Sequence, residues 1–278
     1  MKTAVLKFGG DVVAETATLI AVLRDVQALV EEGWRFVLVH GGGPQASDLQ
    51  ARLGLATLKV AGRRVTDATT LQVMKQVLAG EVSVDVVAAA RAAKLRAVGI
   101  SGVSDGLISA TRRPPIDVPG EDAPVDFGLV GEITEVRAHA VTHLWQGGFT
   151  PVVNSLGVAP ESVAKEAACE VFNINADTVA STLAAHLEVD HLFLMTGVPG
   201  VLRDKDDAST RIERLTPREA SEAIAAGVIV DGMIPKVQEA FLRLEQGISA
   251  VHILGAGPGE LAGEARSPGS RGTALVSE

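Results

Sequence analysis

The sequence predicts an α/β fold with a mainly parallel central sheet that helices cover on both faces. Three observations predict it. Short apolar runs alternate with segments of helical periodicity along the chain, early strands end in the glycine turns Gly9-Gly10 and Gly41-Gly42-Gly43, and helical patterns follow these turns. Strands that alternate with helices pair in parallel, because the helix provides the crossover. A chain of 278 residues can form one large domain or two lobes.

The first half of the chain opens with two strand–helix units. The segment 3–8 is a predicted strand that ends at Gly9, and 14–32 is a predicted helix that Gly33 closes. The strand 35–40 then runs into the three consecutive glycines. Further predicted elements are helices at 45–53, 67–79, 82–94 and 137–146, strands at 96–101 and 149–154, an irregular loop at 111–124, and a hairpin or edge strand at 126–133.

The second half repeats this alternation. Thr216 is a predicted N-cap, and Pro217 then occupies the first position of a helix. The segment between residues 155 and 172 is a candidate lobe boundary. The predicted elements are helices at 175–187, 217–226 and 233–246, strands at 191–196, 250–254 and 272–276, and a turn at 197–200.

Composition and charge exclude several classes of protein. A net charge of −9 and only 3% aromatic residues, with no Tyr, argue against a nucleic-acid surface, although a local basic pocket for small anions remains open. No apolar run approaches the roughly 20 residues of a membrane helix, and no signal-peptide pattern begins the chain. The single cysteine, Cys169, is interpreted as a small buried residue. These features predict a cytoplasmic protein.

The segment 35–45 is the strongest local candidate for a binding site. A glycine has no Cβ, so the amides of Gly41, Gly42 and Gly43 can approach an anion closely while the next helix presents its positive end. The pattern therefore predicts a seat for a phosphate or a carboxylate. His40, at the end of the strand, is interpreted as a structural residue.

Other anion-binding motifs fit less well. The string from Gly41 through Gly43 to Ala46 matches the dinucleotide fingerprint literally, and Arg63 and Arg64 follow about 20 residues later, where an NADP phosphate partner could lie. An entire strand–helix unit precedes this string, however, whereas the fingerprint normally lies in the first such unit. The sequence contains no Gly-Lys-Ser/Thr string of a P-loop, and its single Cys and scattered His residues show no zinc spacing.

Six motifs, spread over nearly the whole chain, carry a family resemblance. In order and approximate spacing they resemble the amino acid kinase family, in the branch that phosphorylates N-acetylglutamate. The resemblance implies an open αβα sandwich with a substrate and dimerisation lobe (residues 1–170) followed by an ATP lobe (residues 171–278). The motifs are Lys7-Phe-Gly-Gly10, His40-Gly-Gly-Gly-Pro44, Gly62-Arg-Arg-Val-Thr-Asp67, Val125-Asp-Phe-Gly-Leu-Val-Gly131, Asn173-Ile-Asn-Ala-Asp177 and Gly232-Met-Ile-Pro-Lys236.

The resemblance implies a role for each matching residue. Lys7 would stabilise the transferring γ-phosphoryl group, Lys236 the leaving oxygen, and Asp177 would orient both ammonium groups. Arg64 and Asn173 would bind the α-carboxylate of N-acetylglutamate. The backbone would contribute the amides of Gly42 and Gly43 to the γ-carboxylate, the amides of Gly9 and Gly10 to the phosphoryl group, and Gly197, Val198, Pro199, Gly200, Val201, Leu202, Val228, Ile229 and Val230 to ATP.

The implied chemistry agrees with the residue types. A γ-carboxylate is already ionised at pH 7, so its attack on ATP needs no general base, whereas the transferring phosphoryl group needs cations and N–H donors. Mg²⁺ is expected with ATP, although no residue can be named as its protein ligand. In the family, members that arginine inhibits carry an extra helix before the first strand, whereas the first strand here begins near Thr3. The resemblance therefore implies a homodimer rather than a hexamer, and it implies no inhibition of this type by arginine.

Two departures from the family and two rivals remain open. Gly197 stands where the family usually has Asp, and the segment from Ser101 to Gly106 is one residue longer than usual, which predicts a reshaped loop beside the substrate. The nearest rival is a kinase that phosphorylates aminoadipate or glutamate on an acidic carrier protein, which the acidity of this chain does not favour. A sensor that binds ATP or an amino acid without catalysis is the rival of a different class.

Overall fold

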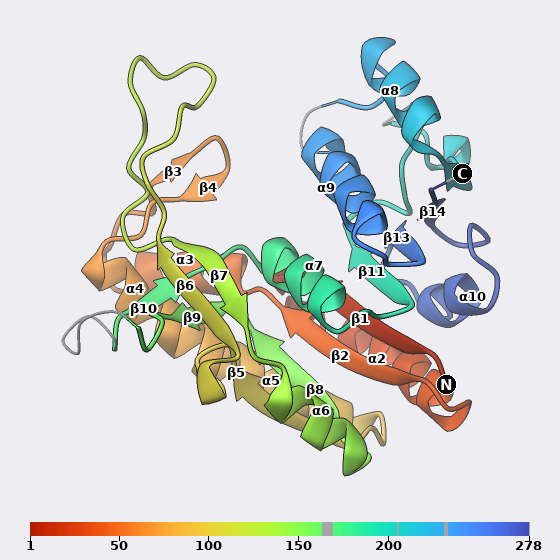
Figure 1. Ribbon diagram of the computed structural model, residues 1–278, viewed down its shortest axis with the longest axis horizontal. Coiled ribbons are helices and arrows are strands. Elements are labelled where there is room, and N and C mark those ends of the chain that lie inside the picture. Colours follow the sequence, from red (N-terminus) through yellow and green to blue (C-terminus); the bar gives the residue numbers. More distant parts are fainter. Residues whose placement is uncertain (163–168, 205, 231–232, 278) are drawn as a thin grey trace.

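An eight-stranded sheet runs through the centre of the molecule (Figure 1). The computed structural model describes residues 1–162, 169–204, 206–230 and 233–277. The strand order is β12-β14-β13-β11-β1-β2-β8-β5, and the six strands from β13 to β5 are parallel, whereas β14 pairs antiparallel with β13. The strands are β1 (Thr3–Phe8), β2 (Arg35–His40), β5 (Ala97–Ser101), β8 (Thr150–Asn154), β11 (His191–Met195), β12 (Arg214–Leu215), β13 (Ala250–Leu254) and β14 (Thr273–Leu275).

Helices cover both faces of this sheet, as predicted. Side chains alternate along β1, so Val5 packs in one core with α6, α7 and α9, whereas Leu6 packs in a second core with α2, α5 and α10. The parallel strands are buried on both sides, which explains their almost continuous apolar sequences. The helices are α1 (Gly10–Ala14), α2 (Thr16–Glu31), α3 (Gly43–Arg52), α4 (Ala68–Lys75), α5 (Ser83–Ala92), α6 (His139–Gln146), α7 (Ala176–His186), α8 (Pro217–Ala225), α9 (Met233–Glu245) and α10 (Glu260–Arg266).

Two smaller sheets lie beyond the end of β2. One is a four-stranded sheet in the order β10-β9-β6-β7, and the other is the short hairpin of β3 and β4, which stands next to the loop after β6 in Figure 1. Short helices of other types complete the chain: a π-helix at Gln76–Val82 and 3₁₀ turns at Ser104–Gly106 and Ala208–Thr210. The strands are β3 (Lys59–Val60), β4 (Arg63–Arg64), β6 (Ile108–Arg112), β7 (Gly131–Val136), β9 (Leu156–Val158) and β10 (Val171–Asn173).

The predicted break between two helices at residues 79–82 was wrong. The helices α4 and α5 continue into one another through the π-helix Gln76–Val82, which contains Gly80. Burial of Val77, Leu78 and Val82 stabilises the helical path and outweighs the weak helix propensity of the glycine. The N-cap prediction at the other end of the molecule is confirmed, because Thr216 and Glu219 form a complete capping box.

Other differences concern short elements. The predicted strand at 126–133 begins only at Gly131, and β6 occupies the start of the predicted loop at 111–124. Sequence analysis did not predict β9, β10 or α10, because elements of three to seven residues show too little periodicity. Cys169 is exposed rather than buried, since it lies at the surface just before β10.

The eight-stranded sheet takes strands from both predicted lobes. Strands β1, β2, β5 and β8 come from residues 1–170, whereas β11 to β14 come from residues 171–278. The division of the chain at residue 170 therefore stays a prediction. In the part of the chain that the structure describes, no helix is both long enough and apolar enough to cross a membrane.

Candidate active site

The carboxyl ends of β1 and β2 meet the N-terminus of α7 at one edge of the sheet. Lys7 lies opposite Val39 of β2 and Leu194 of β11, so its strand is flanked on both sides near its end. Its side chain shares the face of Val5, which is the face that α7 covers. The carboxyl edge of a parallel sheet is where open α/β folds bind ligands.

Three charged side chains form the centre of this edge, which we call the lysine–carboxylate cluster: Lys7, Asp177 and Lys236. Nζ of Lys7 lies 2.8 Å from Oδ1 of Asp177, and Nζ of Lys236 lies 3.1 Å from its Oδ2. The side chains of Lys7, Asp177 and Lys236 are 12%, 23% and 29% exposed, so they are sheltered and still reach solvent. Segments far apart in the sequence thus bring both predicted lysines to one carboxylate.

The cluster carries an excess of positive charge. Burial alone would raise the pKa of the Asp177 carboxyl, but the ammonium groups of Lys7 and Lys236 outweigh burial and lower this pKa below its usual value. Asp177 is therefore ionised at neutral pH and neutralises one of the two ammonium charges. The remaining charge and the unused N–H donors can stabilise an anion.

The local sequence explains why Asp177 is held in place. Asn175 is the N-cap of α7, and its Oδ1 accepts a hydrogen bond of 2.7 Å from the amide of Asp177. Asp177 then lies in the first turn, where the positive end of the helix dipole favours a carboxylate.

The two glycine turns pack directly against each other. The amide of Gly41 donates to the carbonyl of Phe8 over 3.3 Å, and Nε2 of Gln45 donates to the carbonyl of Gly10 over 2.6 Å. A Cβ at Gly10 would collide with Gln45 and would lie 2.9 Å from Cδ of Pro44. Glycine is therefore required at this position, because any side chain would force the turns apart.

His40 is buried between these elements. Its Nδ1–H donates to the carbonyl of Gly41 over 3.0 Å, and burial lowers the pKa of the imidazole to about 4. The ring is therefore neutral at pH 7. This agrees with the interpretation of His40 as a structural residue.

A cavity of about 630 Å³ opens beside the lysine–carboxylate cluster. Gly41, Gly42, Gly43, Asn173 and Asp177 line it together with six cationic residues, and its acidic residues are Asp177 and Glu239. The cavity therefore concentrates positive charge within a protein that is acidic as a whole, and small anions would bind there. The six cationic residues are Lys59, Arg63, Arg64, Arg113, Lys236 and Arg243.

Arg64, which lines this cavity, is held in place by several hydrogen bonds. Its guanidinium donates to the carbonyl of Gly43 over 3.0 Å, to Oγ of Ser47 over 2.7 Å, and to Oε1 of Gln50. Burial lowers the pKa of Arg64, which nevertheless keeps its charge at pH 7 because its ordinary value is far higher.

Asn173 also lines this cavity, and its Nδ2 donates to Oγ1 of Thr66 over 3.2 Å. Arg63, by contrast, is exposed on the rim.

Some predicted residues lie outside the lining of this cavity. Lys7, Gly9 and Gly10 adjoin it through Asp177 and the glycine turn. The predicted ATP-binding segments 197–202 and 228–230 do not line it, so their assignment stays a prediction. Gly232, in the sixth motif of the resemblance, lies outside the described residues. The longer segment at Ser101–Gly106 forms a 3₁₀ turn in which Asp105 has a φ of 53°, and it does not line the cavity either.

Sequence analysis missed several residues of the cavity. Arg113 follows β6 at the start of the long loop, and Ser155 lies between β8 and β9, where no motif marks either residue. Glu239 and Arg243 could have been found, because they follow Lys236 at intervals of three and seven residues on α9 and so share its face.

The structure shows no ready-made metal site in the part of the chain that it describes. Residues 1–162, 169–204, 206–230 and 233–277 contain no group of three His, Cys, Asp or Glu side chains that could hold a metal ion. Asp177, the carboxylate of the lysine–carboxylate cluster, is already paired with two ammonium groups. The described side chains therefore do not form a cage for Mg²⁺.

Comparison with known proteins gives consistent results. The model of the amino acid kinase family matches residues 2–255. The chain is 48% identical to an acetylglutamate kinase of Sorangium cellulosum over 98% of its own length and 94% of that protein. It is 47% identical to an acetylglutamate kinase of Anaeromyxobacter sp. (strain K) over the full length of both proteins.

Solved structures share the fold. An N-acetylglutamate synthase from Neisseria gonorrhoeae, complexed with coenzyme A and N-acetyl-glutamate, superposes with a TM-score of 0.81 at 26% identity, covering all of this chain and 60% of that one. A carbamate kinase from Giardia superposes with a TM-score of 0.70 at 16% identity, covering 100% of this chain and 99% of that one. At such low identity, the second match describes the fold alone.

Proposed function

This chain belongs to the amino acid kinase family and is an ATP-dependent kinase of N-acetyl-L-glutamate, and we propose that the lysine–carboxylate cluster and its cavity carry out the transfer. One observation supports this assignment above all. A single carboxylate, that of Asp177, holds the ammonium groups of Lys7 and Lys236 together beside the glycine turn at Gly41 to Gly43.

The reaction needs charge stabilisation rather than proton transfer. The γ-carboxylate of N-acetylglutamate is ionised at pH 7, and one of its oxygens forms the new bond to the γ-phosphorus of ATP. The bond from that phosphorus to the β,γ-bridging oxygen breaks, and ADP leaves with the electron pair. No proton has to move, which fits a cluster built from two cations and a carboxylate that is ionised at neutral pH.

The two lysines stabilise negative charge on different parts of the reacting ATP. Lys7 stabilises the transferring phosphoryl group, with the amides of Gly9 and Gly10 as further donors, and Lys236 stabilises the oxygen on which ADP leaves. Asp177 keeps both ammonium groups in position, so that little reorganisation is needed during the reaction.

The acceptor binds in the same cavity, beside Arg64. Arg64, oriented by Gly43, Ser47 and Gln50, binds the α-carboxylate together with Asn173. The amides of Gly42 and Gly43 hold the γ-carboxylate.

ATP binds in the second half of the chain, along the segments 197–202 and 228–230. Mg²⁺ would accompany ATP and neutralise part of the charge on its phosphate groups. The segment 228–230 precedes α9, which carries Lys236, so the nucleotide and this lysine meet from adjacent parts of the chain.

The proposed assembly is a homodimer in the cytoplasm. Among the described strands, β5 ends the eight-stranded sheet with one edge unpaired, and Val84 of the adjoining α5 is 63% exposed. A second copy could cover both features. Light scattering should give the mass of two chains, and a monomer at micromolar concentration would contradict the dimer. The single cysteine fits a reducing compartment.

A hydroxylamine assay tests the function directly. Hydroxylamine converts an acyl phosphate into a hydroxamate, so ATP, Mg²⁺ and N-acetylglutamate should give a coloured product. Glutamate, aspartate, UMP and a carrier-bound glutamate serve as parallel substrates. A product formed only from the carrier-bound substrate, or none from any substrate with correctly folded protein, would contradict the proposal.

A further inference from the structure

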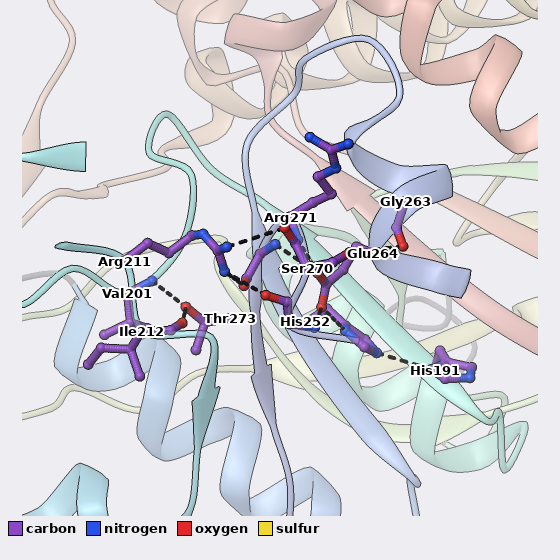
Figure 2. Close-up of polar contacts among 12 residues, drawn as sticks. His191, Val201, Arg211, Ile212, His252, Gly263, Glu264, Ser270, Arg271 and Thr273 are labelled. Carbon is purple, nitrogen blue, oxygen red and sulfur yellow. Dashed lines mark hydrogen bonds and ion pairs between the residues drawn. The ribbon is translucent and has the colours of Figure 1, made fainter. Parts of the chain in front are cut away.

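A buried carboxylate lies on the opposite face of the sheet from the lysine–carboxylate cluster. Glu264 of α10 has no exposed surface, and neither has His252 of β13 beside it. His191 of β11 adjoins His252, and we call these three residues the histidine–glutamate cluster. Figure 2 shows the polar contacts that continue from this cluster to Thr273 and Val201.

Four N–H groups donate to the two oxygens of Glu264. Oε1 accepts from Nδ1 of His252 over 2.8 Å and from the amide of Gly269 over 2.7 Å, and Oε2 accepts from the amides of Arg271 and Gly272 over 2.9 Å and 2.7 Å. Burial alone would raise the pKa of this carboxyl, but these hydrogen bonds lower it to about 2. The ionised carboxylate thus fixes the shape of the turn at residues 267–272.

The two histidines hold the carboxylate from the other side. Because Nδ1 of His252 donates to Glu264, its Nε2 is left to accept from Nδ1–H of His191 over 3.0 Å. This row of hydrogen bonds ties α10 to β13 and β11. The position of the turn therefore depends on the sheet as well as on α10.

A second set of contacts connects the turn with the segment 197–202. The guanidinium of Arg211 donates to the carbonyls of Gly269 and Gly272, and Thr273, directly after the turn, accepts from the amide of Val201 over 2.9 Å. Thr273 also donates to the carbonyl of Ile212 over 2.5 Å. Thr273 thus supports the segment 197–202, and Glu264 holds Arg271 and Gly272, which directly precede Thr273.

Gly200 shows how close this contact is. Its φ is 158°, and a Cβ placed there would lie 2.6 Å from Oγ1 of Thr273. Any larger residue would push the segment away from Thr273. The backbone of 197–202 is therefore shaped to fit this support.

We infer that Glu264 is a positioning residue for nucleotide binding, which acts through the turn 267–272 and Thr273 on the segment 197–202. This inference rests on the proposed function, because that function assigns the segment to ATP. Glu264 contacts His252, Gly269, Arg271 and Gly272, and none of these is proposed to bind N-acetylglutamate. Its loss should therefore weaken the binding of ATP and leave the binding of N-acetylglutamate unchanged.

Two variants test the inference, one at the contacts of Glu264 with the turn 267–272 and one at the contact of Thr273 with Val201. Glu264→Gln replaces one acceptor oxygen by an NH₂ group that faces two N–H donors, and Thr273→Val removes the acceptor for Val201 with almost no change in shape. Thr150→Val is the matched control, because Thr150 is a buried threonine of β8, far along the sheet. For each variant we would measure the KM of both substrates, the affinity for a non-hydrolysable ATP analogue, and the melting temperature.

The expected result is specific to one substrate. Thr273→Val should raise the KM for ATP and the dissociation constant of the analogue by about fivefold to tenfold, the effect of one or two hydrogen bonds, with the KM for N-acetylglutamate within about twofold. Glu264→Gln should raise the KM for ATP and the dissociation constant of the analogue by at least as much. Thr150→Val should leave the KM values of both substrates unchanged.

Two outcomes would separate the inference from the proposed function. If wild-type protein forms hydroxamate but folded Thr273→Val has an unchanged KM for ATP, or loses both affinities equally, the positioning role is wrong while the function stands. If wild-type protein forms no hydroxamate and does not bind the analogue, the proposed function fails first. Should Glu264→Gln not fold, Thr273→Val still tests the contact on which the role of Glu264 depends, and an unchanged KM for ATP in that variant would overturn the inference.

Discussion

The two charged clusters of this protein lie on opposite faces of one sheet and differ in how their charges are satisfied. In the lysine–carboxylate cluster, Asp177 faces two ammonium groups beside a cavity, so positive charge and N–H donors remain unused. In the histidine–glutamate cluster, each oxygen of Glu264 accepts two hydrogen bonds and the carboxylate has no exposed surface. The comparison indicates that surplus donors beside open space serve chemistry, whereas a fully satisfied buried charge serves to hold a shape.

The largest expected effect comes from breaking the open cluster. Lys7→Ala and Lys236→Ala should each lower kcat by about 10³-fold with the KM values within a few-fold, because the lost charge acts mainly on the transition state. Lys75→Ala, which removes an exposed lysine at the end of α4, is the control. Steady-state kinetics would test this, and a variant whose KM rises while its kcat stays normal would contradict the assigned roles.

Arg64→Ala should have the next largest effect, and on a different constant. The loss of a charge-assisted grip on a carboxylate should raise the KM for N-acetylglutamate by about 10-fold to 100-fold with little change in kcat. Arg63→Ala is a matched control, since Arg63 is the exposed neighbour on the rim, and its effect should be several times smaller. An effect of Arg64→Ala on turnover alone would refute a binding role.

Acid should affect the two clusters in separate ranges of pH. The pKa of His191 is lowered from 6.5 to about 4, by burial first and then by His252, so between these values the unfolded chain binds a proton that the folded chain excludes. Stability is therefore lost as pH falls from 6.5 toward 4. The pKa of Asp177 lies below 3.8, so its contribution is present above that value and is lost only at lower pH.

Denaturant titrations at pH 7 and pH 5 would measure the loss of unfolding free energy between pH 6.5 and pH 4. His191 should account for about 2 kcal/mol of it, and His40, whose pKa is lowered to about 4 as well, for a similar amount. His191→Asn keeps a hydrogen-bonding group and should remove roughly half of the loss. An unchanged difference between pH 7 and pH 5 in this variant would show that the buried cluster does not titrate in this range.

The smallest expected effect concerns Gly197, where the family usually has Asp. A Cβ at this position would meet no atom within 4 Å, so Gly197→Asp should fold with an unchanged melting temperature. If the segment 197–202 contacts ATP, the KM for ATP should fall by no more than about threefold, as expected for one added polar contact. A change in the KM for N-acetylglutamate instead would place this segment at the other substrate.

Periodicity and glycine turns alone were enough to predict the central strands, most of the long helices and the helices on both faces. These patterns are local, because an apolar strand or an amphipathic helix of ten residues or more is recognisable from its own residues. The six motifs also indicated Lys7, Arg64, Asn173, Asp177 and Lys236 as site residues. That Lys7 and Lys236 both reach Asp177 was implied only by the family resemblance, and the structure shows the two contacts.

The tertiary structure alone decided the rest. The continuous path from α4 through the π-helix to α5 depends on burial of Val77, Leu78 and Val82, and the place of Arg113 in the cavity depends on the fold of a long loop. The histidine–glutamate cluster joins residues 191, 252 and 264 from three elements, and no motif connects them. Hydrogen bonds between distant segments form only after the chain has folded, so neither spacing nor composition could indicate them.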